Sequence, residues 1–445
     1  IIYLNKAFQI SSFDETVIIV ESVDERKAAE YFKHLLKEKF GVVIPIDSKL
    51  SGDKVKIVLK REEIKNAVND QHYEIGYDEK ENSIIAKSGS QIGLLFASVT
   101  LSELFEKINE QFFINLASVN DYPDFSIRII SANPNTENVF ALLDYALKNK
   151  IETISVASRQ YPWYEVSENY KNLFEKIKEW KDKYGGPSIM QMHNIYEEKD
   201  IEISNEADLK NLKEVIKTGI KNGADKLMIL ADDTPPFKFG EGYILTSEND
   251  KQKFKHMAEA HSFLMSDLKR WISENSFESE LYYVPPFYTY EDMHYGDMEL
   301  FKNTQWEKAA YEPLLRDLNY IGSNMPDDVF IIWTGPFVRS RKISEDDLND
   351  WTKNLNGRIP FLWDNTIYSR NSFISSPMFS AWDNDFPNNF YSWTAGNGMF
   401  INGDECGEDS KASAVTVNDY MWNSKNYSPQ NSLTAAMQRI YGEEN

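Results

Sequence analysis

Two adjacent acids, Asp232 and Asp233, follow directly on the apolar run Lys226–Ala231. Such a run is typical of a buried parallel strand, and the carboxyl ends of these strands carry the chemistry of α/β barrels. Because neighbouring carboxylates repel each other, one is favoured as an acid while the other stays an anion. An acid and an anion in one cleft can cleave a glycosidic bond. The pair alone is equally compatible with a helix N-cap or a turn.

The composition of the chain narrows the class of ligand. The 445 residues carry a net charge of −22, which argues against a nucleic-acid partner and against docking on an anionic membrane. Hydrophobic residues make up 42%, enough for a large core. The 10 Trp and 24 Tyr suit a cleft in which aromatic rings stack on sugars, although a large core also uses such residues.

Metal and cofactor sites are not expected. Cys406 is the only cysteine and there are 6 His with no HExxH motif, which excludes a disulfide framework and the usual zinc patterns. The acidic stretches Asp383–Asp385 and Asn402–Glu405 do not follow the calcium-loop pattern. No Gly-rich phosphate loop occurs, and no apolar run approaches the roughly 18 residues of a membrane span.

The chain divides into three predicted parts: a small α+β domain over residues 1–122, a barrel over 123–404, and a closing helix with a tail over 405–445. In the first part, strand-like runs accompany a helix over Glu25–Phe40 and a hairpin around Asp78–Asn82. The closing helix is expected over Ala412–Trp422.

From residue 123 on, short apolar strands alternate with amphipathic helices, which predicts a (β/α)8 TIM-like barrel. The predicted helices include Asn138–Lys148, Tyr170–Tyr184 and Glu206–Lys221. The predicted strands are Ile127–Ala132, Thr153–Ala157, Ser188–His193, Lys226–Ala231, Leu281–Val284, Val329–Trp333, Ile359–Trp363 and Gly398–Asn402.

Polar and aromatic residues stand at or just beyond the carboxyl ends of these strands, where a barrel gathers its ligand site. Taken singly, each is compatible with a structural role; His193, for example, could be a satisfied core histidine. The candidate set is Asn133, Arg159, His193, Asp232, Asp233, Tyr288, Trp333, Trp363, Asn365 and Asn402.

The segment Ile331–Ser340, which contains Trp-Thr-Gly-Pro, and the segment Pro360–Asn365, which contains Trp-Asp-Asn, closely resemble glycoside hydrolase family 84. That family comprises β-N-acetylglucosaminidases, among them O-GlcNAc hydrolases and hyaluronidase-like enzymes. The Asp-Asp pair stands in the expected place ahead of these motifs. Ser88–Phe96 resembles the small α/β domain that precedes the barrel in families 20 and 84.

The resemblance implies roles for individual residues. Asp233 would be the general acid, and Asp232 would hold the N–H of the substrate's 2-acetamido group. The acetamido oxygen would then act as the internal nucleophile and form an oxazoline, a recognised exception to the protein-nucleophile scheme. Tyr288 would bond the acetamido oxygen and Trp363 would pack on the acetyl methyl group.

Further positions match sugar-binding ones in the family. Asn365 and Asn402 match polar positions near the sugar or the leaving group, and Arg159 stands where the family usually has a Lys.

Two departures from the family pattern concern the rest of the sugar ring. The family opens its first barrel strand with Glu-Gly-Phe-Tyr-Gly, where this chain has Ile130–Asn135. The family's Asp after Trp-Asp-Asn is absent, and Thr366–Arg370 stands there instead. A modified, internal or anionic acetamido sugar is one explanation, because Arg159 and Arg370 could pair with a carboxylate or sulfate. The other is that neighbouring residues replace the lost contacts to ordinary GlcNAc.

The sequence thus predicts a retaining β-N-acetylhexosaminidase acting on a glycoconjugate that carries a β-linked N-acetylhexosamine. One alternative is a glycosidase with a second carboxylate as nucleophile, for which Asp364 or Glu405 would have to serve. Another is a non-catalytic glycan-binding protein on a decayed barrel. A glycan-foraging bacterial enzyme is usually exported, which favours a periplasmic, surface or secreted location.

Overall fold

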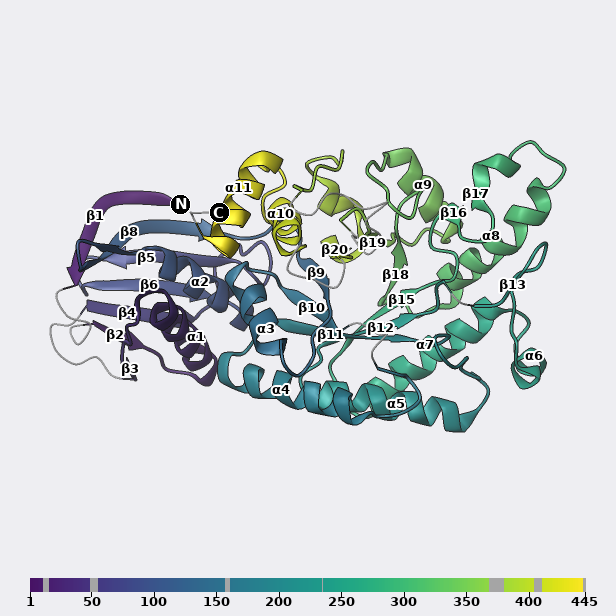
Figure 1. The fold of residues 1–445 in the computed structure, drawn as a ribbon, viewed down its shortest axis with the longest axis horizontal. Coiled ribbons are helices and arrows are strands. Elements are labelled where there is room, and N and C mark those ends of the chain that lie inside the picture. The colour runs from purple at the N-terminus through teal and green to yellow at the C-terminus, as the bar shows by residue number, and fades with distance from the viewer. Residues whose placement is uncertain are drawn as a thin grey trace. The chain divides into compact units, whose positions relative to one another are not determined.

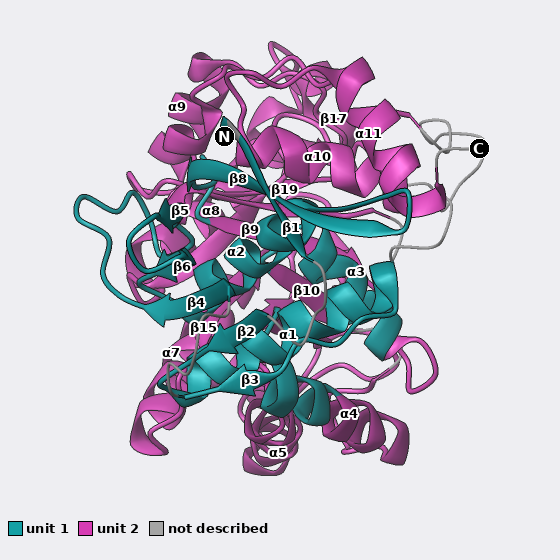
Figure 2. Cartoon of the chain, turned by 90° about the vertical axis from the view of Figure 1, so that its left-hand side faces the viewer, with its two compact units in different colours: residues 1–126, 140–152, 177–187 teal, residues 127–139, 153–176, 188–445 magenta. Residues whose placement is uncertain are grey.

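The structure, a computed structural model, describes residues 1–10, 16–48, 55–156, 161–233, 235–367, 380–403 and 410–442 (Figure 1). The chain forms two compact units (Figure 2). Unit 1 comprises Ile1–Ser126, Phe140–Glu152 and Ile177–Pro187, and unit 2 comprises Ile127–Val139, Thr153–Lys176 and Ser188–Asn445. Unit 1 therefore takes in two helical pieces that the sequence assigns to the barrel domain, and it runs past residue 122 to Ser126.

Unit 1 is built on an eight-stranded mixed sheet with the order β1-β8-β5-β6-β4-β2-β3, and β7 pairs with β8. Its helices are α1 (Val23–Phe40) and α2 (Gln91–Glu103). A capping box between Ser22 and Glu25 starts α1, and Gly41 in the left-handed conformation ends it. The strands are β1 (Ile2–Ile10), β2 (Thr16–Ile19), β3 (Ile46–Asp47), β4 (Val55–Arg61), β5 (Tyr73–Asp78), β6 (Ser83–Ser88), β7 (Phe105–Ile108) and β8 (Gln111–Asp121).

Unit 2 contains a closed barrel of eight parallel strands, which confirms the predicted (β/α)8 fold. Their order around the barrel is β10-β11-β12-β15-β18-β19-β20-β9. The strands are β9 (Ile127–Ala132), β10 (Thr153–Val156), β11 (Ser188–Asn194), β12 (Lys226–Leu230), β15 (Glu280–Val284), β18 (Val329–Trp333), β19 (Phe361–Asp364) and β20 (Gly398–Ile401).

Helices and short hairpins connect these strands (Figure 1). The helices are α3 (Val139–Lys148), α4 (Glu168–Tyr184), α5 (Glu206–Lys221), α6 (Glu248–Lys253), α7 (Met257–Glu274), α8 (Glu307–Asn324) and α9 (Glu345–Asn354), with the 3-10 turns η3 (Met298–Phe301), η4 (Phe390–Trp393) and η5 (Ala395–Asn397). One hairpin, β13 (Phe237–Lys238) with β14 (Gly242–Tyr243), follows β12, and another, β16 (Glu291–Asp292) with β17 (Gly296–Asp297), follows β15.

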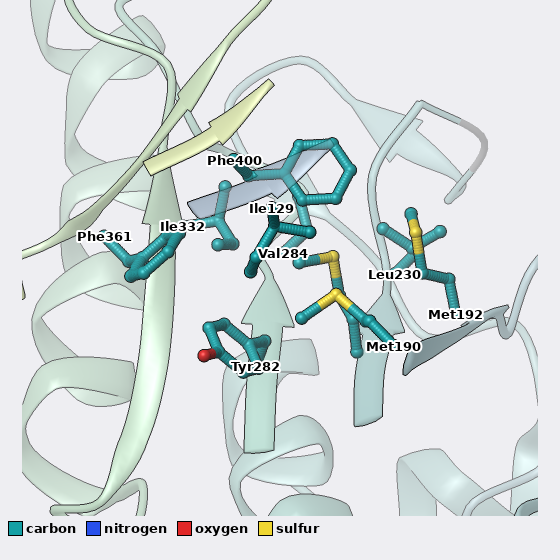
Figure 3. Packing of buried hydrophobic residues seen from close by; sticks show 10 residues of the cluster. Ile129, Met190, Met192, Leu230, Tyr282, Val284, Ile332, Phe361 and Phe400 are labelled. Atoms are coloured by element: carbon teal, nitrogen blue, oxygen red, sulfur yellow. The ribbon is translucent and has the colours of Figure 1, made fainter. Parts of the chain in front are cut away.

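The barrel interior is filled by apolar side chains that alternate along the strands (Figure 3). On β11 these are Met190 and Met192, and on β12 they are Met228 and Leu230. The barrel is thus a packed core, and any ligand site must lie beyond its strand ends.

The C-terminal part contains two helices. The predicted closing helix is α10 (Lys411–Trp422), which is almost entirely buried. Where the sequence suggests a tail, the structure has a further helix, α11 (Pro429–Tyr441), which begins with Pro429 in its first turn and packs on α10. No helix in the described part of the chain is both long and apolar enough to cross a bilayer.

Candidate active site

The alternation of side chains along each strand decides which residues reach the barrel mouth. Leu230 faces the interior, so the same phase carries Asp232, two residues on, to the mouth. In β19 and β20 the interior residues are Trp363 and Phe400, and the phase continues to Asn365 and Asn402.

Asp233 contacts a tyrosine in the loop that follows β15, the next strand of the barrel. The Tyr288 hydroxyl donates a hydrogen bond of 3.1 Å to Oδ1 of Asp233. Asp232 is half-buried, Asp233 is exposed, and Tyr288 is half-buried. Burial and the charges of Asp233 and Asp232 raise the pKa of Tyr288 well above its ordinary value. The phenol therefore stays protonated and can donate to an oxygen of a ligand throughout the neutral range.

Asp233 adopts an unusual backbone conformation. Its φ of 63° lies in the left-handed region, which costs an L-residue roughly 1 to 2 kcal/mol. Aspartate tolerates this region better than most side chains, but the conformation must be held by its surroundings.

Trp363, Asn365 and Asn402 form one hydrogen-bonded chain on the opposite part of the mouth. Trp363 Nε1 donates to Asn365 Oδ1 at 2.7 Å, and Asn402 Nδ2 donates to the same oxygen at 2.9 Å. The Trp363 ring stacks on Phe400 with centroids 4.0 Å apart. Asn365 also donates to the Val338 carbonyl at 2.9 Å and is only 8% exposed. It therefore fixes Trp363 and Asn402 in place.

The loop after β18 connects these two groups of residues. Thr334 N donates to the Tyr288 carbonyl at 3.2 Å, and Thr289 Oγ1 donates to the Gly335 carbonyl at 2.9 Å. At its other end, this loop receives the hydrogen bond from Asn365 at Val338. The Trp-Thr-Gly-Pro motif thus connects Tyr288 with a second group of residues, the Trp363 wall, which comprises Trp363, Asn365 and Asn402.

The structure does not bring His193 or Trp333 to the mouth. His193 follows the interior residue Met192 and so has the opposite phase; it is 1% exposed, and Gln191 Oε1 accepts a hydrogen bond of 3.1 Å from its Nε2. Trp333 is also 1% exposed and stacks on Trp351 of α9. Both side chains lie between the barrel and its helices, so the expectation that they contact a sugar does not hold in this structure.

The burial of His193 makes a prediction about stability. Burial lowers the pKa of His193 from 6.5 to about 3. Between pH 6.5 and 3 the unfolded chain therefore binds a proton at this side chain and the folded chain does not. Through this group the free energy of unfolding falls by about 1.4 kcal/mol for each unit by which the pH decreases. We expect His193→Gln to be less stable than the parent at pH 7.5 and to show a shallower decline of the unfolding free energy between pH 6 and 4.5, measured by urea unfolding. If the unfolding free energies of the two proteins declined in parallel with pH, the lowered pKa of His193 would be contradicted.

The remaining candidates contribute less to the described site. Asn133 is half-buried beyond the end of β9, and its carbonyl accepts a hydrogen bond of 3.4 Å from Asn138. Arg159 and Arg370 lie outside the described residues, as do Glu405 and Cys406.

One contributing residue, Ser131, was not predicted. Ser131 of β9 donates from Oγ to Asn402 Oδ1 at 3.3 Å and accepts from Gly403 N at 3.0 Å. Because β9 is buried on both faces, the sequence does not reveal its phase, and only the interior position of Ile129 in the structure identifies Ser131, two residues later, as a residue of the mouth.

One cluster among the described residues has the composition of a cation site, and it lies in unit 1. It comprises His34, Glu38 and Asp144. The Lys148 ammonium lies 2.6 Å from a carboxylate oxygen of Glu38 and 2.6 Å from one of Asp144, so a lysine already supplies the positive charge.

The sequence and the fold of this chain are similar to those of known proteins. A family model for β-N-acetylglucosaminidase matches residues 159–445. No curated protein sequence matches the chain. The solved structure of CpGH84B has a TM-score of 0.73 at 18% identity, and the match covers 99% of this chain and 73% of that one. For CpGH84D the TM-score is 0.70 at 16% identity, with 98% and 70% covered.

A mutant O-GlcNAc hydrolase from Thermobaculum terrenum gives a TM-score of 0.58 at 19% identity, with 72% of this chain and 64% of that one covered. At these identities the structural likeness establishes the fold. The family model matches well over half of the chain and includes the Asp-Asp pair, Tyr288 and the Trp363 wall. The chain therefore belongs to the β-N-acetylglucosaminidases of glycoside hydrolase family 84.

Proposed function

We propose that the chain is a retaining β-N-acetylglucosaminidase in which the substrate's own 2-acetamido group is the nucleophile. In the first step Asp233 gives a proton to the glycosidic oxygen as the C1–O bond breaks, and the acetamido oxygen bonds to C1. Asp232 accepts the acetamido N–H and stabilises the positive charge of the oxazolinium. In the second step Asp233 takes a proton from water, which attacks C1 and restores the acetamide with the β configuration retained.

The observation that carries this proposal is the hydrogen bond between Tyr288 and the second acid of an adjacent pair at the barrel mouth. When a substrate binds, this phenol, which carries one hydrogen, would donate it to the acetamido oxygen instead of to Asp233 and so aim that oxygen at C1. The two acids then have different surroundings, since Asp232 is half-buried and Asp233 is exposed. This difference fits one group that holds the amide and another that exchanges protons with the leaving group and water.

The Trp363 wall supports the same assignment. Its indole is fixed by Asn365 and by the stack on Phe400, so it offers a rigid apolar surface at the mouth. The methyl group of a substrate's acetamide can pack on such a surface.

The alternative with a protein nucleophile finds little support in Asp364. That mechanism needs a second carboxylate about 5 Å from the acid. Asp364 is 3% exposed, and its Oδ2 accepts hydrogen bonds from Trp382 Nε1 at 2.6 Å and Asn384 Nδ2 at 3.1 Å. Burial raises its pKa, and its phase along β19 is opposite to that of Trp363. It is a structural acid of the layer outside the barrel.

Two aryl glycosides that differ only at C2 test the proposal. We expect turnover of 4-nitrophenyl β-GlcNAc and a kcat/KM at least about 10³-fold lower for the β-glucoside, because the glucoside lacks the intramolecular nucleophile. The first sugar released should be the β anomer, observed by proton NMR. Comparable turnover of the two would favour a protein nucleophile. GlcNAc binding without turnover of either would favour a glycan-binding protein.

A further inference from the structure

The segments that follow Asp233 and Tyr288 each form a short hairpin, and the two hairpins are joined. After Asp233 come β13 and β14, and after Tyr288 come β16 and β17. The Tyr243 hydroxyl of β14 donates a hydrogen bond of 2.7 Å to Oδ2 of Asp292 in β16. Both residues are 3% exposed. Beside this pair, the ring of Phe237 stacks on His294 with centroids 4.3 Å apart and an interplanar angle of 8°.

Asp292 is the centre of this junction. Its Oδ1 accepts the backbone N–H of His294 at 2.8 Å and that of Tyr295 at 3.3 Å, which fixes the turn of its own hairpin. Its Oδ2 is left for Tyr243 of the other hairpin. Hydrogen bonds to a buried carboxylate are stronger than neutral ones, and removing the donor leaves part of a charge unsolvated.

The other ends of both hairpins are also anchored. Ile244 N donates to the Pro236 carbonyl at 2.8 Å, which closes the hairpin after Asp233. Gly242 has a φ of 84°, and a Cβ atom there would lie 3.0 Å from Pro313 Cβ of α8, so only glycine fits without a shift. On the other side, Val338 N donates to Glu291 Oε2 at 2.8 Å.

We propose that Tyr243 and Asp292 are positioning residues. Their hydrogen bond acts as a clamp between the two hairpins and holds Asp233 at its place beside Tyr288. The inference rests on the proposed role of Asp233 as the acid. Asp233 occupies a left-handed conformation that is unfavourable for an L-residue, and it precedes the clamped hairpin by only a few residues. Displacement of a catalytic group by about 1 Å can lower a rate about 10²-fold.

Leaving-group dependence separates positioning of the acid from general damage. A 2,4-dinitrophenyl β-GlcNAc needs little help from an acid, whereas a methylumbelliferyl or alkyl β-GlcNAc needs more. We expect Tyr243→Phe and Asp292→Asn to lower kcat/KM roughly 10- to 100-fold for the alkyl glycoside and much less for the dinitrophenyl glycoside.

The matched control is Tyr290→Phe. The Tyr290 hydroxyl also donates to a carboxylate, Asp350 Oδ2 at 2.5 Å. This bond ties the loop between β15 and β16 to α9 and does not join the hairpins. Its leaving-group dependence should remain that of the parent. Equal losses on both glycosides in Tyr243→Phe, or the same pattern in Tyr290→Phe, would overturn the proposal.

Amide hydrogen exchange provides a readout that needs no turnover. Tyr243→Phe should raise exchange in residues 237–243 and 291–298, and Tyr290→Phe should not raise it in 237–243. Unchanged exchange in Tyr243→Phe would overturn the clamp whatever the kinetics. If the parent protein hydrolysed neither glycoside, the proposed function would fall, and the exchange data would still decide whether the clamp exists.

Discussion

Replacing Asp233 by asparagine should lower kcat/KM for an alkyl β-GlcNAc by about 10²- to 10⁴-fold, the usual contribution of a general acid. Asparagine keeps the size of the side chain and the ability to accept the bond from Tyr288, but it cannot deliver a proton. The loss should be much smaller for 2,4-dinitrophenyl β-GlcNAc, whose leaving group departs as a stable anion. Steady-state kinetics on both substrates measure the difference.

Azide adds a second signature to this variant. Azide attacks C1 without losing a proton, so it should restore turnover of the activated substrate and give the β-glycosyl azide. Glu241→Gln is the matched control, because Glu241 is an exposed acid in the nearby turn between β13 and β14. The kinetics of this variant should remain those of the parent. Equal losses of Asp233→Asn on both substrates, or no loss on either, would contradict the role of Asp233.

Replacing Asp232 by asparagine should also lower kcat/KM, by about 10²- to 10³-fold, but in a different way. Asparagine can still contact the acetamide, yet it removes the negative charge that stabilises the oxazolinium. Because proton delivery by Asp233 is intact, both glycosides should lose activity to a similar extent, and azide should give no rescue.

The two variants therefore predict opposite patterns, and comparing them is more informative than either alone. If Asp232→Asn showed strong leaving-group dependence and azide rescue while Asp233→Asn showed neither, the roles would be exchanged. Because Asp233 is exposed and Asp232 only half-buried, we expect both variants to fold. Circular dichroism and thermal unfolding of both proteins would establish that the loss of activity is chemical.

The barrel could be predicted because its strands are buried on both faces and read as short apolar runs. Val329–Trp333, for example, is the strand β18 residue for residue. The same burial hides the phase of each strand. Ser188–Asn194 has Met190 and Met192 facing the interior, but Ile189 on the other face is equally buried, so hydropathy does not reveal that His193 points away from the mouth.

Other parts of the structure lacked a periodic signal. The strands β13 and β16 have two residues each, too few to show alternation, so the junction between Tyr243 and Asp292 was not visible in the sequence. Helix α11 buries only Ser432 and Ala436, which leaves a weak apolar stripe and explains why it reads as a tail. The acids and Tyr288 were found because they lie just beyond strand ends, where chain order alone fixes the location.

Fluorination of the acetamido group tests the central claim most directly. In 4-nitrophenyl β-glycosides bearing N-acetyl, N-fluoroacetyl, N-difluoroacetyl and N-trifluoroacetyl groups, each fluorine makes the carbonyl oxygen a weaker nucleophile with little change in size. If this oxygen attacks C1 between Asp232 and Tyr288, kcat/KM should fall steeply and regularly along the series. A kcat/KM that stays constant from N-acetyl to N-trifluoroacetyl would show that the acetamide takes no part in the attack.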